Sequence, residues 1–246
     1  RNFGLDFSAY KDATLFRRLE KAVLTRQLPS TEVYYRHLLE DAEAQLQLYY
    51  EFLIGVTSWF RDPEMYQELT ESVYPDLFKQ VQHQEFLRVW VAGCSTGEEA
   101  YSLAISLAEY QRTHHLNQKV KIFASDTNSE AIKTASDGIY AFSDIEMIDA
   151  ALRQRYFLDL GDRVQVNDYI RGMVVFAQQN LINDPPFINV DLISCRNVLI
   201  YFKPAYQKKL LLNFEFGLRK AGFLWLGSSE TLGDHQKDFD VISNTA

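Results

Sequence analysis

The stretch that decides the fold is FLRVWVAGCSTGEE, residues 86–99. Its first seven residues form a short apolar run that only Arg88 interrupts, which predicts a strand buried within a sheet. Gly93 ends this run, and a helical pattern extends from Gly97 to about Arg112. A buried strand that leads through a glycine turn into a helix indicates an α/β fold.

The same alternation continues toward the C-terminus. Further strands are predicted at residues 120–125, 190–195 and 223–227, and helices at 128–136 and 204–220. Strands that alternate with helices predict a Rossmann-like parallel sheet with helices on both faces.

Residues 138–177 interrupt this rhythm. Residues 163–167 alternate between polar and apolar, and residues 173–176 form a compact apolar run. Both are predicted to belong to a small antiparallel β insertion. Residues 227–230, with the sequence GSSE, are predicted to be a turn after the last strand.

The chain before residue 86 has a helical pattern. From 14 to 28 one predicted face carries apolar residues and the opposite face carries basic ones. The apolar face consists of Leu15, Phe16, Leu19, Ala22 and Val23, and the basic face of Arg17, Arg18 and Lys21. A break at residues 29–31 supplies an N-cap for a helix-rich segment at 32–55. A further helix is predicted at 62–82, with Asp62 as its cap.

The composition excludes several classes of function. The chain has 246 residues and a formal net charge of −8, which argues against a nucleic-acid partner because phosphate binding needs a basic surface. No apolar run approaches the ~20 residues of a membrane helix, so no direct membrane insertion is expected. The five histidines show no metal-ligand spacing, and none is assigned to a metal. Cys94 and Cys195 are predicted to be reduced core thiols, as in a cytoplasmic protein.

The loop after the strand at 86–92 is the strongest candidate binding site. In an open α/β sheet, ligands bind beyond the carboxyl ends of the strands, where Gly93 allows a close approach. Two interpretations of Glu98 and Glu99 at the helix start remain open. They repel a phosphate and so select a cationic ligand, or they do no more than complement the helix dipole. Asp126 ends the second strand and either binds ribose hydroxyls or caps the next helix. Together these residues favour S-adenosylmethionine over a dinucleotide.

Three long motifs follow one another along the chain: residues 57–62 (TSWFRD), residues 93–102 (GCSTGEEAYS) and residues 191–202 (DLISCRNVLIYF). Together they resemble one known family, the CheR-type chemotaxis receptor methyltransferases. Their order and spacing match the family across nearly the whole chain. The resemblance is greatest to CheR domains fused to a methylesterase or to signalling modules.

This resemblance implies a protein-glutamate O-methyltransferase that binds S-adenosylmethionine and its product S-adenosylhomocysteine. It implies a helical N-terminal domain at 1–61 that lacks its first helix, a linker helix at 62–85, and a class I methyltransferase domain at 86–246. The last strand of that domain is expected to be truncated, and 138–177 to be its β-subdomain. The cofactor-binding positions are Thr57, Arg61, Gly93, Glu99, Asp126, Asn180, Leu181 and Asn197. Gly55 departs from the family, which often has Asn there.

Methyl transfer to a carboxylate requires few catalytic groups, and Arg61 and Tyr201 are the expected ones. The expected partner is the cytoplasmic helical domain of a chemotaxis-type receptor, docked on Arg17, Arg18 and Lys21. Family members that use a receptor's C-terminal pentapeptide tether have a longer loop within the β-subdomain. The connection here is only residues 158–163, so no tether is expected.

The sequence leaves two alternative functions. Residues 183–187 (NDPPF) resemble a motif of DNA amino-methyltransferases, but they precede a strand where that motif follows one. A non-catalytic domain that senses the cofactor or docks a partner is the second alternative, and Gly55 favours it.

Overall fold

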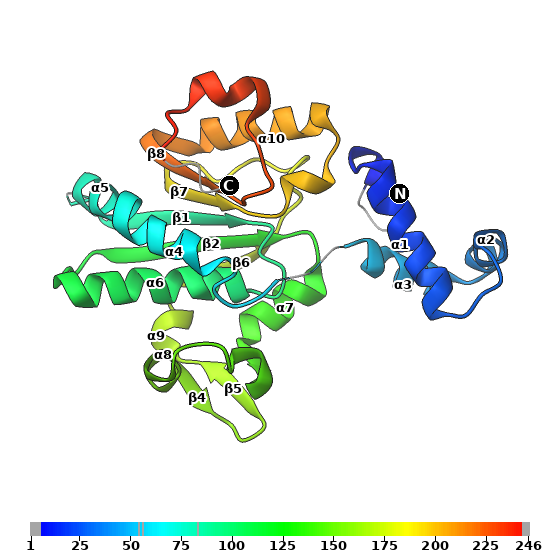
Figure 1. Cartoon of the computed structure of the whole chain (residues 1–246), viewed down its shortest axis with the longest axis horizontal. Coiled ribbons are helices and arrows are strands. Elements are labelled where there is room, and N and C mark those ends of the chain that lie inside the picture. The colour runs from blue at the N-terminus through cyan, green and yellow to red at the C-terminus, as the bar shows by residue number, and fades with distance from the viewer. Residues whose placement is uncertain (1–5, 54, 56, 83, 243–246) are drawn as a thin grey trace.

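The structure is a computed structural model that describes residues 6–53, 55, 57–82 and 84–242. Figure 1 shows a group of N-terminal helices joined to a larger body in which helices surround a sheet. The body is a Rossmann-like α/β unit and carries a small separate antiparallel sheet. The fold class predicted from the alternation of strands and helices is therefore confirmed.

The main sheet has five strands in the order β6-β2-β1-β7-β8, and every neighbouring pair is parallel. The strands are β1 (Phe86–Ala92), β2 (Lys119–Asp126), β6 (Val174–Gln178), β7 (Val190–Cys195) and β8 (Leu218–Leu226). The chain builds outward from β1 to β6 and then returns to the other side of β1. The strand order therefore reverses beside β1, which is where open α/β sheets bind their ligands.

Strand β1 is buried on both faces. Leu87, Val89 and Val91 belong to one core with α5 (Tyr74–Gln80) and α6 (Glu98–His114). Trp90 lies in a second core with α10 (Pro204–Gly217). Successive side chains of a strand point to opposite faces, so a near-continuous apolar run is needed to fill both cores.

The remaining elements of the body connect and cover these strands. They are α4 (Pro63–Glu68), α7 (Ser129–Asp137), the short 3₁₀ helix η4 (Leu199–Tyr201) and the 3₁₀ helix η5 (Gly233–Asp238). Residues Leu69–Val73 form a π-helical turn between α4 and α5. Residues 63–80 thus form the helix expected at 62–82, with this turn inside it.

The small sheet has the order β3-β5-β4 and is antiparallel, as predicted for the insertion. Its elements are β3 (Ile139–Ala141), η3 (Phe142–Ile145), α8 (Ala150–Tyr156), β4 (Phe157–Asp159), β5 (Arg163–Val166) and α9 (Asp168–Arg171). The Glu109 carboxylate of α6 accepts hydrogen bonds from Arg155 and Tyr156 of α8. Burial opposes ionisation of Glu109, but its bonds to Arg112, Tyr156 and Arg155 hold its pKa at about 2.

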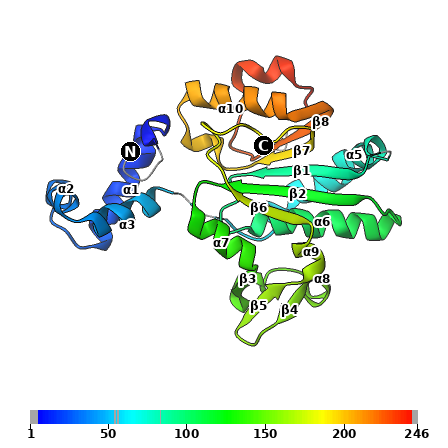
Figure 2. The same ribbon diagram turned by 180° about the vertical axis from the view of Figure 1, so that it is seen from behind.

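The prediction that residues 173–176 belong to this insertion is wrong. They lead into β6, which pairs in parallel with β2 and forms one edge of the main sheet, as Figure 2 shows. Polar and apolar residues alternate at 163–167, which is typical of a strand with one face exposed to solvent. The continuous apolar run at 173–176 is typical of a parallel strand buried on both faces. The two patterns belong to two different sheets.

The boundary between the last helix and strand was also placed too late. The helix expected to reach residue 220 ends at Gly217, and β8 begins at Leu218. A Cβ atom at Gly217 would lie 2.6 Å from the Phe187 carbonyl oxygen, so only glycine allows this approach. The pairing register between β7 and β8 shifts between Val190 and Leu192. Val190 pairs with Leu218 and Leu192 with Phe223, so β8 begins before the apolar residues from Phe223 onward.

The N-terminal part consists of η1 (Phe7–Ala9), α1 (Asp12–Thr25), α2 (Thr31–Glu40) and α3 (Ala42–Phe52). Ser30 caps α2 by accepting the Val33 N–H, as predicted. Ala22, Val23 and Tyr34 form its small core. Phe16 was expected in the apolar face of α1 but is 64% exposed, because three short helices leave only part of that face covered.

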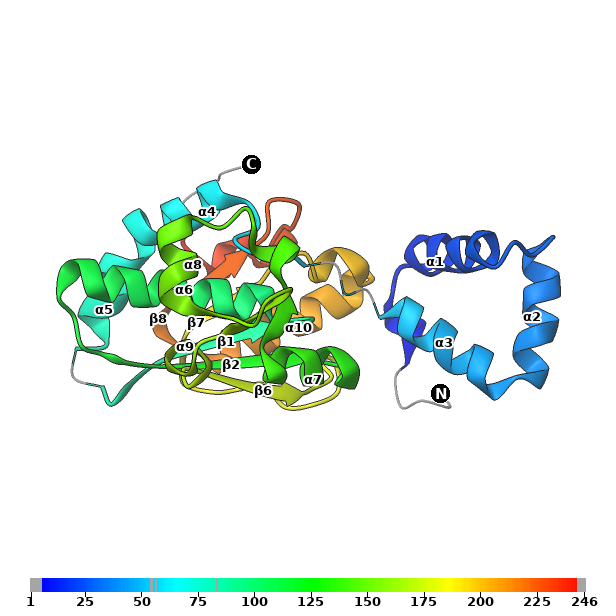
Figure 3. The same cartoon turned by 90° about the horizontal axis from the view of Figure 1, so that it is seen from below.

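Figure 3 shows the N-terminal helices to one side of the body, and a strip of paired backbone is among their contacts with it. Tyr10 and Phe202 form an isolated antiparallel bridge, in which the Lys11 N–H donates to the Tyr201 carbonyl and the Lys203 N–H to the Ala9 carbonyl. The Tyr10 and Phe202 ring centroids lie 4.8 Å apart. The N-terminal part is therefore attached beside Tyr201.

The prediction that Asp62 caps the helix expected at 62–82, which begins with α4 in the structure, is wrong. Its backbone is left-handed, with φ 56°, and its side chain makes no capping hydrogen bond. The carboxylate instead accepts a hydrogen bond from Arg196 at 2.8 Å. A buried guanidinium needs a charged partner more than an exposed helix end needs a cap.

Within the described residues, none of the helices combines the length and the apolar character that a membrane-spanning helix requires.

Candidate active site

A pocket opens at the carboxyl edge of the sheet, beside the reversal of strand order. Its walls come from the ends of β1, β2, β6 and β7, and from the chain segments before α1 and α4. The residues that line it are Tyr10, Leu53, Gly55, Thr57, Arg61, Gly93, Ser95, Glu99, Asp126, Thr127, Asn128, Ala131, Gln179, Asn180, Leu181, Ile182, Arg196, Asn197, Val198, Tyr201 and Phe202. Every cofactor-binding and catalytic position expected from the sequence lies in this wall. Arg17, Arg18 and Lys21 lie on α1, outside it.

The glycine loop after β1 lets two parts of the chain approach each other. Gly93 has φ +79°, and a Cβ atom there would lie 2.5 Å from a Val198 methyl group. Gly97 has φ +97° and precedes α6, where a Cβ atom would lie 2.8 Å from that of Ala135. Side chains are strained at both positions, so the loop keeps its shape through glycine.

Asp126 at the end of β2 holds this loop in place. Its two carboxylate oxygens accept the Ser95 N–H and the Asn128 N–H, each at 2.9 Å. Burial raises the pKa of Asp126, although both of these bonds favour the ionised form. The cap of α7 is Asn128, which accepts the N–H groups of Glu130 and Ala131. Asp126 is therefore not the helix cap that the sequence left open.

Glu99 and Arg196 form a buried ion pair at the other end of the pocket. Their nearest charged atoms, Arg196 Nη1 and Glu99 Oε2, are 3.6 Å apart. The Ser194 hydroxyl donates to Glu99 at 2.6 Å. Burial raises the pKa of Glu99, and the charge of Arg196 opposes this shift. Glu99 thus serves as a buried charge partner, not only as a complement to the helix dipole.

Arg196 was not assigned to the site, although it lies within the quoted motif at 191–202. Its side chain is fully buried, with its guanidinium 4.3 Å from the centroid of the Trp225 ring. Nη2 donates to the Arg61 carbonyl at 2.9 Å and to Asp62 at 2.8 Å. Its charge in a motif beside a strand end was the signal available in the sequence.

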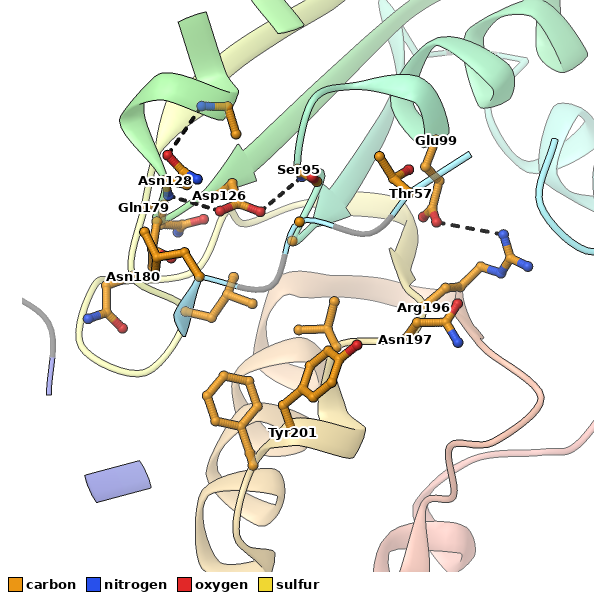
Figure 4. A pocket seen from close by; sticks show the side chains of 18 of the residues that line it. Thr57, Ser95, Glu99, Asp126, Asn128, Gln179, Asn180, Arg196, Asn197 and Tyr201 are labelled. Carbon is orange, nitrogen blue, oxygen red and sulfur yellow. Dashed lines mark hydrogen bonds and ion pairs between the residues drawn. The ribbon is translucent and has the colours of Figure 1, made fainter. Parts of the chain in front are cut away.

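Figure 4 shows two groups of polar residues at opposite ends of the pocket. Asp126, Asn128, Gln179 and Asn180 lie together at one end, and Glu99, Arg196 and Asn197 at the other, with Tyr201 reaching in between them. This bipolar arrangement suits a ligand with a hydroxyl-rich part and a separate charged part.

Residues 183–187 do not contribute to the pocket. Asp184 accepts the Asn180 N–H, and the Phe187 ring stacks on Phe123 in the core. The segment closes the loop between β6 and β7. It is thus a structural connection and differs from the DNA methyltransferase motif in its place in the fold.

Comparison with known proteins identifies the chain. Residues 55–246 match the family described as "CheR methyltransferase, SAM binding domain", and residues 1–54 match "CheR methyltransferase, all-alpha domain". The chain belongs to the CheR methyltransferase family. S-adenosylmethionine is the methyl donor that this CheR domain binds.

Relatives of this CheR chain differ in length. It is 39% identical over 239 residues to an "Uncharacterized 104.1 kDa protein in hypE 3'region" of Rhodobacter capsulatus, covering 97% of this chain and 25% of that protein. It is 33% identical to a "Chemotaxis protein methyltransferase" of Borreliella burgdorferi, covering 94% of this chain and 84% of that protein. The crystal structure of DszA carbon methyltransferase has a TM-score of 0.45 and 17% identity, covering 87% of this chain and 47% of that one.

The pocket of this CheR chain fits S-adenosylmethionine on its own geometry. The Ser95 hydroxyl and the Asn197 side-chain oxygen are buried, and neither has a hydrogen-bond partner among the described residues. The same holds for Nε and Nη1 of Arg196. Buried polar groups without partners are costly, so a polar ligand is the expected partner. Acceptors and guanidinium donors in one pocket suit a molecule that carries both an ammonium and a carboxylate.

Tyr10 was also missed as a lining residue, for a different reason. It comes from the N-terminal part, which the bridge to Phe202 attaches beside the pocket. No spacing rule links residues so far apart in the chain.

The role of Asp126 can be tested directly. Replacing Asp126 with Ala is expected to weaken S-adenosylhomocysteine binding by ~1–3 kcal/mol, the scale of lost hydrogen bonds to a charged group. Titration calorimetry measures this, with Asp137→Ala as a control because Asp137 lies at the end of α7, outside the pocket. Unchanged affinity in Asp126→Ala would rule out the assignment of Asp126 to the nucleoside.

Proposed function

We propose that this CheR chain transfers a methyl group from S-adenosylmethionine to glutamate side chains of chemotaxis-type receptors. The observation that carries the proposal is the pocket itself. It presents unpartnered polar groups of Ser95, Arg196 and Asn197 beside the Tyr201 side chain, within a family that binds this cofactor. Relatives named chemotaxis protein methyltransferase support the receptor as substrate.

Few catalytic groups are needed because a glutamate side chain, with a pKa of ~4.3, is already an ionised nucleophile at neutral pH. S-adenosylmethionine supplies an electrophilic methyl group whose bond to sulfur breaks as the C–O bond of the ester forms. No proton is transferred in this step, so the protein needs no general base. Its contribution is to orient the two reactants and exclude water, which provides up to ~7–11 kcal/mol in favourable systems.

The two groups proposed for this orientation are Arg61 and Tyr201. Both line the pocket, and they approach it from different elements. Arg61 would hold a carboxylate of the cofactor or the substrate, and the Tyr201 hydroxyl would donate to the attacking glutamate. Thr57, Gly93, Glu99, Asp126, Asn180, Leu181 and Asn197 are the positions proposed to bind the cofactor.

The proposal is tested by incubating the chain with labelled S-adenosylmethionine and the cytoplasmic helical domain of a receptor. Label in the receptor that is released as volatile methanol by mild base is the expected result, because carboxyl methyl esters hydrolyse under these conditions. Base-stable label would indicate another acceptor. Cofactor binding without transfer would favour the sensor or docking role, to which Gly55 at the pocket wall lends support.

The place of the substrate is proposed on the N-terminal helices. Arg17 and Lys21 are exposed on α1, and Arg18 is half-buried. Reversing the charge of Arg17 and Lys21 to Glu is expected to raise the apparent KM for an acidic receptor helix, and to do so most at low salt. A KM unaffected at low ionic strength would show that this surface does not bind the receptor. Lys133→Glu on α7 is a control of the same charge change, and Lys133 is also exposed.

No receptor tether is expected to bind the β-subdomain. The turn between β4 and β5 is short: the Leu160 N–H donates to the Arg163 carbonyl, and the Gly161 N–H to Asp159. A pentapeptide with a free C-terminal carboxylate, titrated against the chain, should show no saturable binding. Micromolar affinity would contradict this expectation and reveal a peptide-binding edge on the small sheet.

The working context is also proposed. Methylation of a receptor's helical domain would take place in the cytoplasm, and the formal net charge of −8 favours a partner other than nucleic acid. The Rhodobacter relative, of which this chain spans 25%, supports a place within a longer protein that carries other domains.

A further inference from the structure

Glu230 lies in the turn after β8, outside the candidate active site. Its carboxylate accepts four backbone N–H groups. Oε2 accepts those of Gly227 at 2.7 Å and Asn197 at 2.9 Å, and Oε1 accepts those of Val198 at 2.8 Å and Leu199 at 2.7 Å. A carboxylate has about four lone-pair sites, so this one is filled by the backbone alone. Glu230 does not line the pocket.

The segment that Glu230 binds is the pocket wall after β7. Asn197 has a left-handed backbone, with φ 59°, which ordinary side chains adopt at a cost and Asn tolerates best. The next residues lead into η4, whose last residue is Tyr201. Three consecutive N–H groups that point at one carboxylate fix the direction of this turn. The Asn197 side chain is thereby held at the pocket, with its oxygen buried and unpartnered.

The space around Gly227 supports the same arrangement. A Cβ atom at Gly227 would lie 3.0 Å from Glu230 Oε2 and 3.2 Å from the Asn197 nitrogen. The residue that follows β8 must therefore lack a side chain, so that the Glu230 carboxylate can reach the turn at 197–199. Gly227 and Glu230 together join the chain segments that follow β7 and β8.

We propose that Glu230 is a positioning residue for cofactor binding. It holds the turn at 197–199 so that the Asn197 side chain meets the ligand. This proposal rests on the proposed function, since it names what prepares that same site. A direct electrostatic role toward a cationic ligand is the alternative. The four N–H groups already occupy the acceptor sites of the carboxylate, so none is left for a ligand, which favours positioning.

The test is a double-variant cycle read by S-adenosylhomocysteine affinity. Glu230→Gln keeps the side-chain volume but leaves one acceptor oxygen and turns an NH₂ group toward backbone donors. Its dissociation constant is expected to rise on the order of tenfold, the factor for a net loss of hydrogen bonds to a charged group. Asn197→Gly removes the side chain while keeping a residue that accepts the left-handed backbone. In the Asn197→Gly background, Glu230→Gln should add less than about a twofold loss.

Three further measurements separate positioning from a general loss of stability. Hydrogen exchange of the amides at 197–199 should accelerate in Glu230→Gln without any ligand present. Glu215→Gln, an exposed acid on α10, should change neither exchange nor affinity. Ile105→Val, a buried change in α6, should lower the melting temperature while leaving affinity within about twofold.

The outcomes are distinguishable. Independent, multiplicative losses in the double variant would overturn the proposal, because Glu230 would then act without Asn197. Unchanged exchange and affinity in Glu230→Gln would overturn it as well. If the unaltered chain fails to bind S-adenosylhomocysteine, the proposed function fails first and the proposal falls with it.

Discussion

Replacing Arg196 with Met is expected to lower the free energy of unfolding by ~3–5 kcal/mol, the usual result of removing one partner of a buried ion pair. The Arg196 side chain is fully buried, bridges Asp62 to Glu99 and lies on the Trp225 ring. Methionine fills much of the same volume against Trp225. What it cannot replace is the charge, and Glu99 would then remain buried with the Ser194 hydroxyl and the charge of Arg61 but without its ion-pair partner Arg196. Denaturant unfolding followed by circular dichroism measures the loss.

The loss should depend on pH in a defined direction. Burial raises the pKa of Glu99, and Arg196 counteracts that shift, so its removal raises the pKa further. A carboxyl whose folded pKa lies above its unfolded value of ~4.3 costs stability as pH rises through the folded pKa. Arg196→Met should therefore be less destabilised at pH 5 than at pH 8.

A double variant provides the control. Adding Glu99→Gln to Arg196→Met removes the uncompensated charge and should recover part of the loss, whereas Glu99→Gln alone leaves Arg196 paired with Asp62. A single variant within about 1 kcal/mol of the unaltered chain, with no recovery in the double variant, would show that the pair is not coupled.

Most of the fold was predictable because burial imposes a period on the sequence. The run at 86–92 fills cores on both sides of β1, and that requirement is visible as a continuous apolar stretch. The same pattern at 173–176 was assigned to the wrong sheet because the neighbouring residues 163–167 suggested one unit. Periodicity identifies a strand, but the strand's partner depends on contacts distant in sequence, here between β6 and β2.

The candidate site was predictable where it follows strand ends. Asp126 ends β2, Gly93 directly follows β1 and Asn197 closely follows β7, and parallel strands bring such positions to one edge. Arg196, Glu230 and Tyr10 show the limit of this reasoning. Within the described part of the chain, the hydrogen bonds that Glu230 accepts come from backbone N–H groups, so no partner side chain marks it in the sequence. Tyr10 enters the wall through a backbone bridge, and such bridges leave no residue pattern.

The second large effect is expected at Tyr201, where replacement with Phe should reduce turnover about 10²-fold, the scale of losing one oriented donor. The change removes only a hydroxyl, and the backbone of Tyr201 stays fixed by its bonds to Val198 and Lys11. Figure 4 shows the ring reaching into the pocket between its two polar ends. Because the hydroxyl would act on the attacking glutamate, S-adenosylhomocysteine affinity and the melting temperature should change little.

Arg61 should respond differently, which makes the pair informative. Arg61→Ala is expected to reduce turnover and also to weaken cofactor or receptor binding, since a guanidinium that holds a carboxylate contributes to the ground state. Steady-state kinetics on a receptor helical domain, with melting temperatures measured alongside, separate the two effects. Tyr206→Phe is the matched control for Tyr201, because Tyr206 lies two residues into α10 and outside the pocket. Turnover at the unaltered rate in both Tyr201→Phe and Arg61→Ala would refute the assignment of these residues to methyl transfer, even if the cofactor binds as proposed.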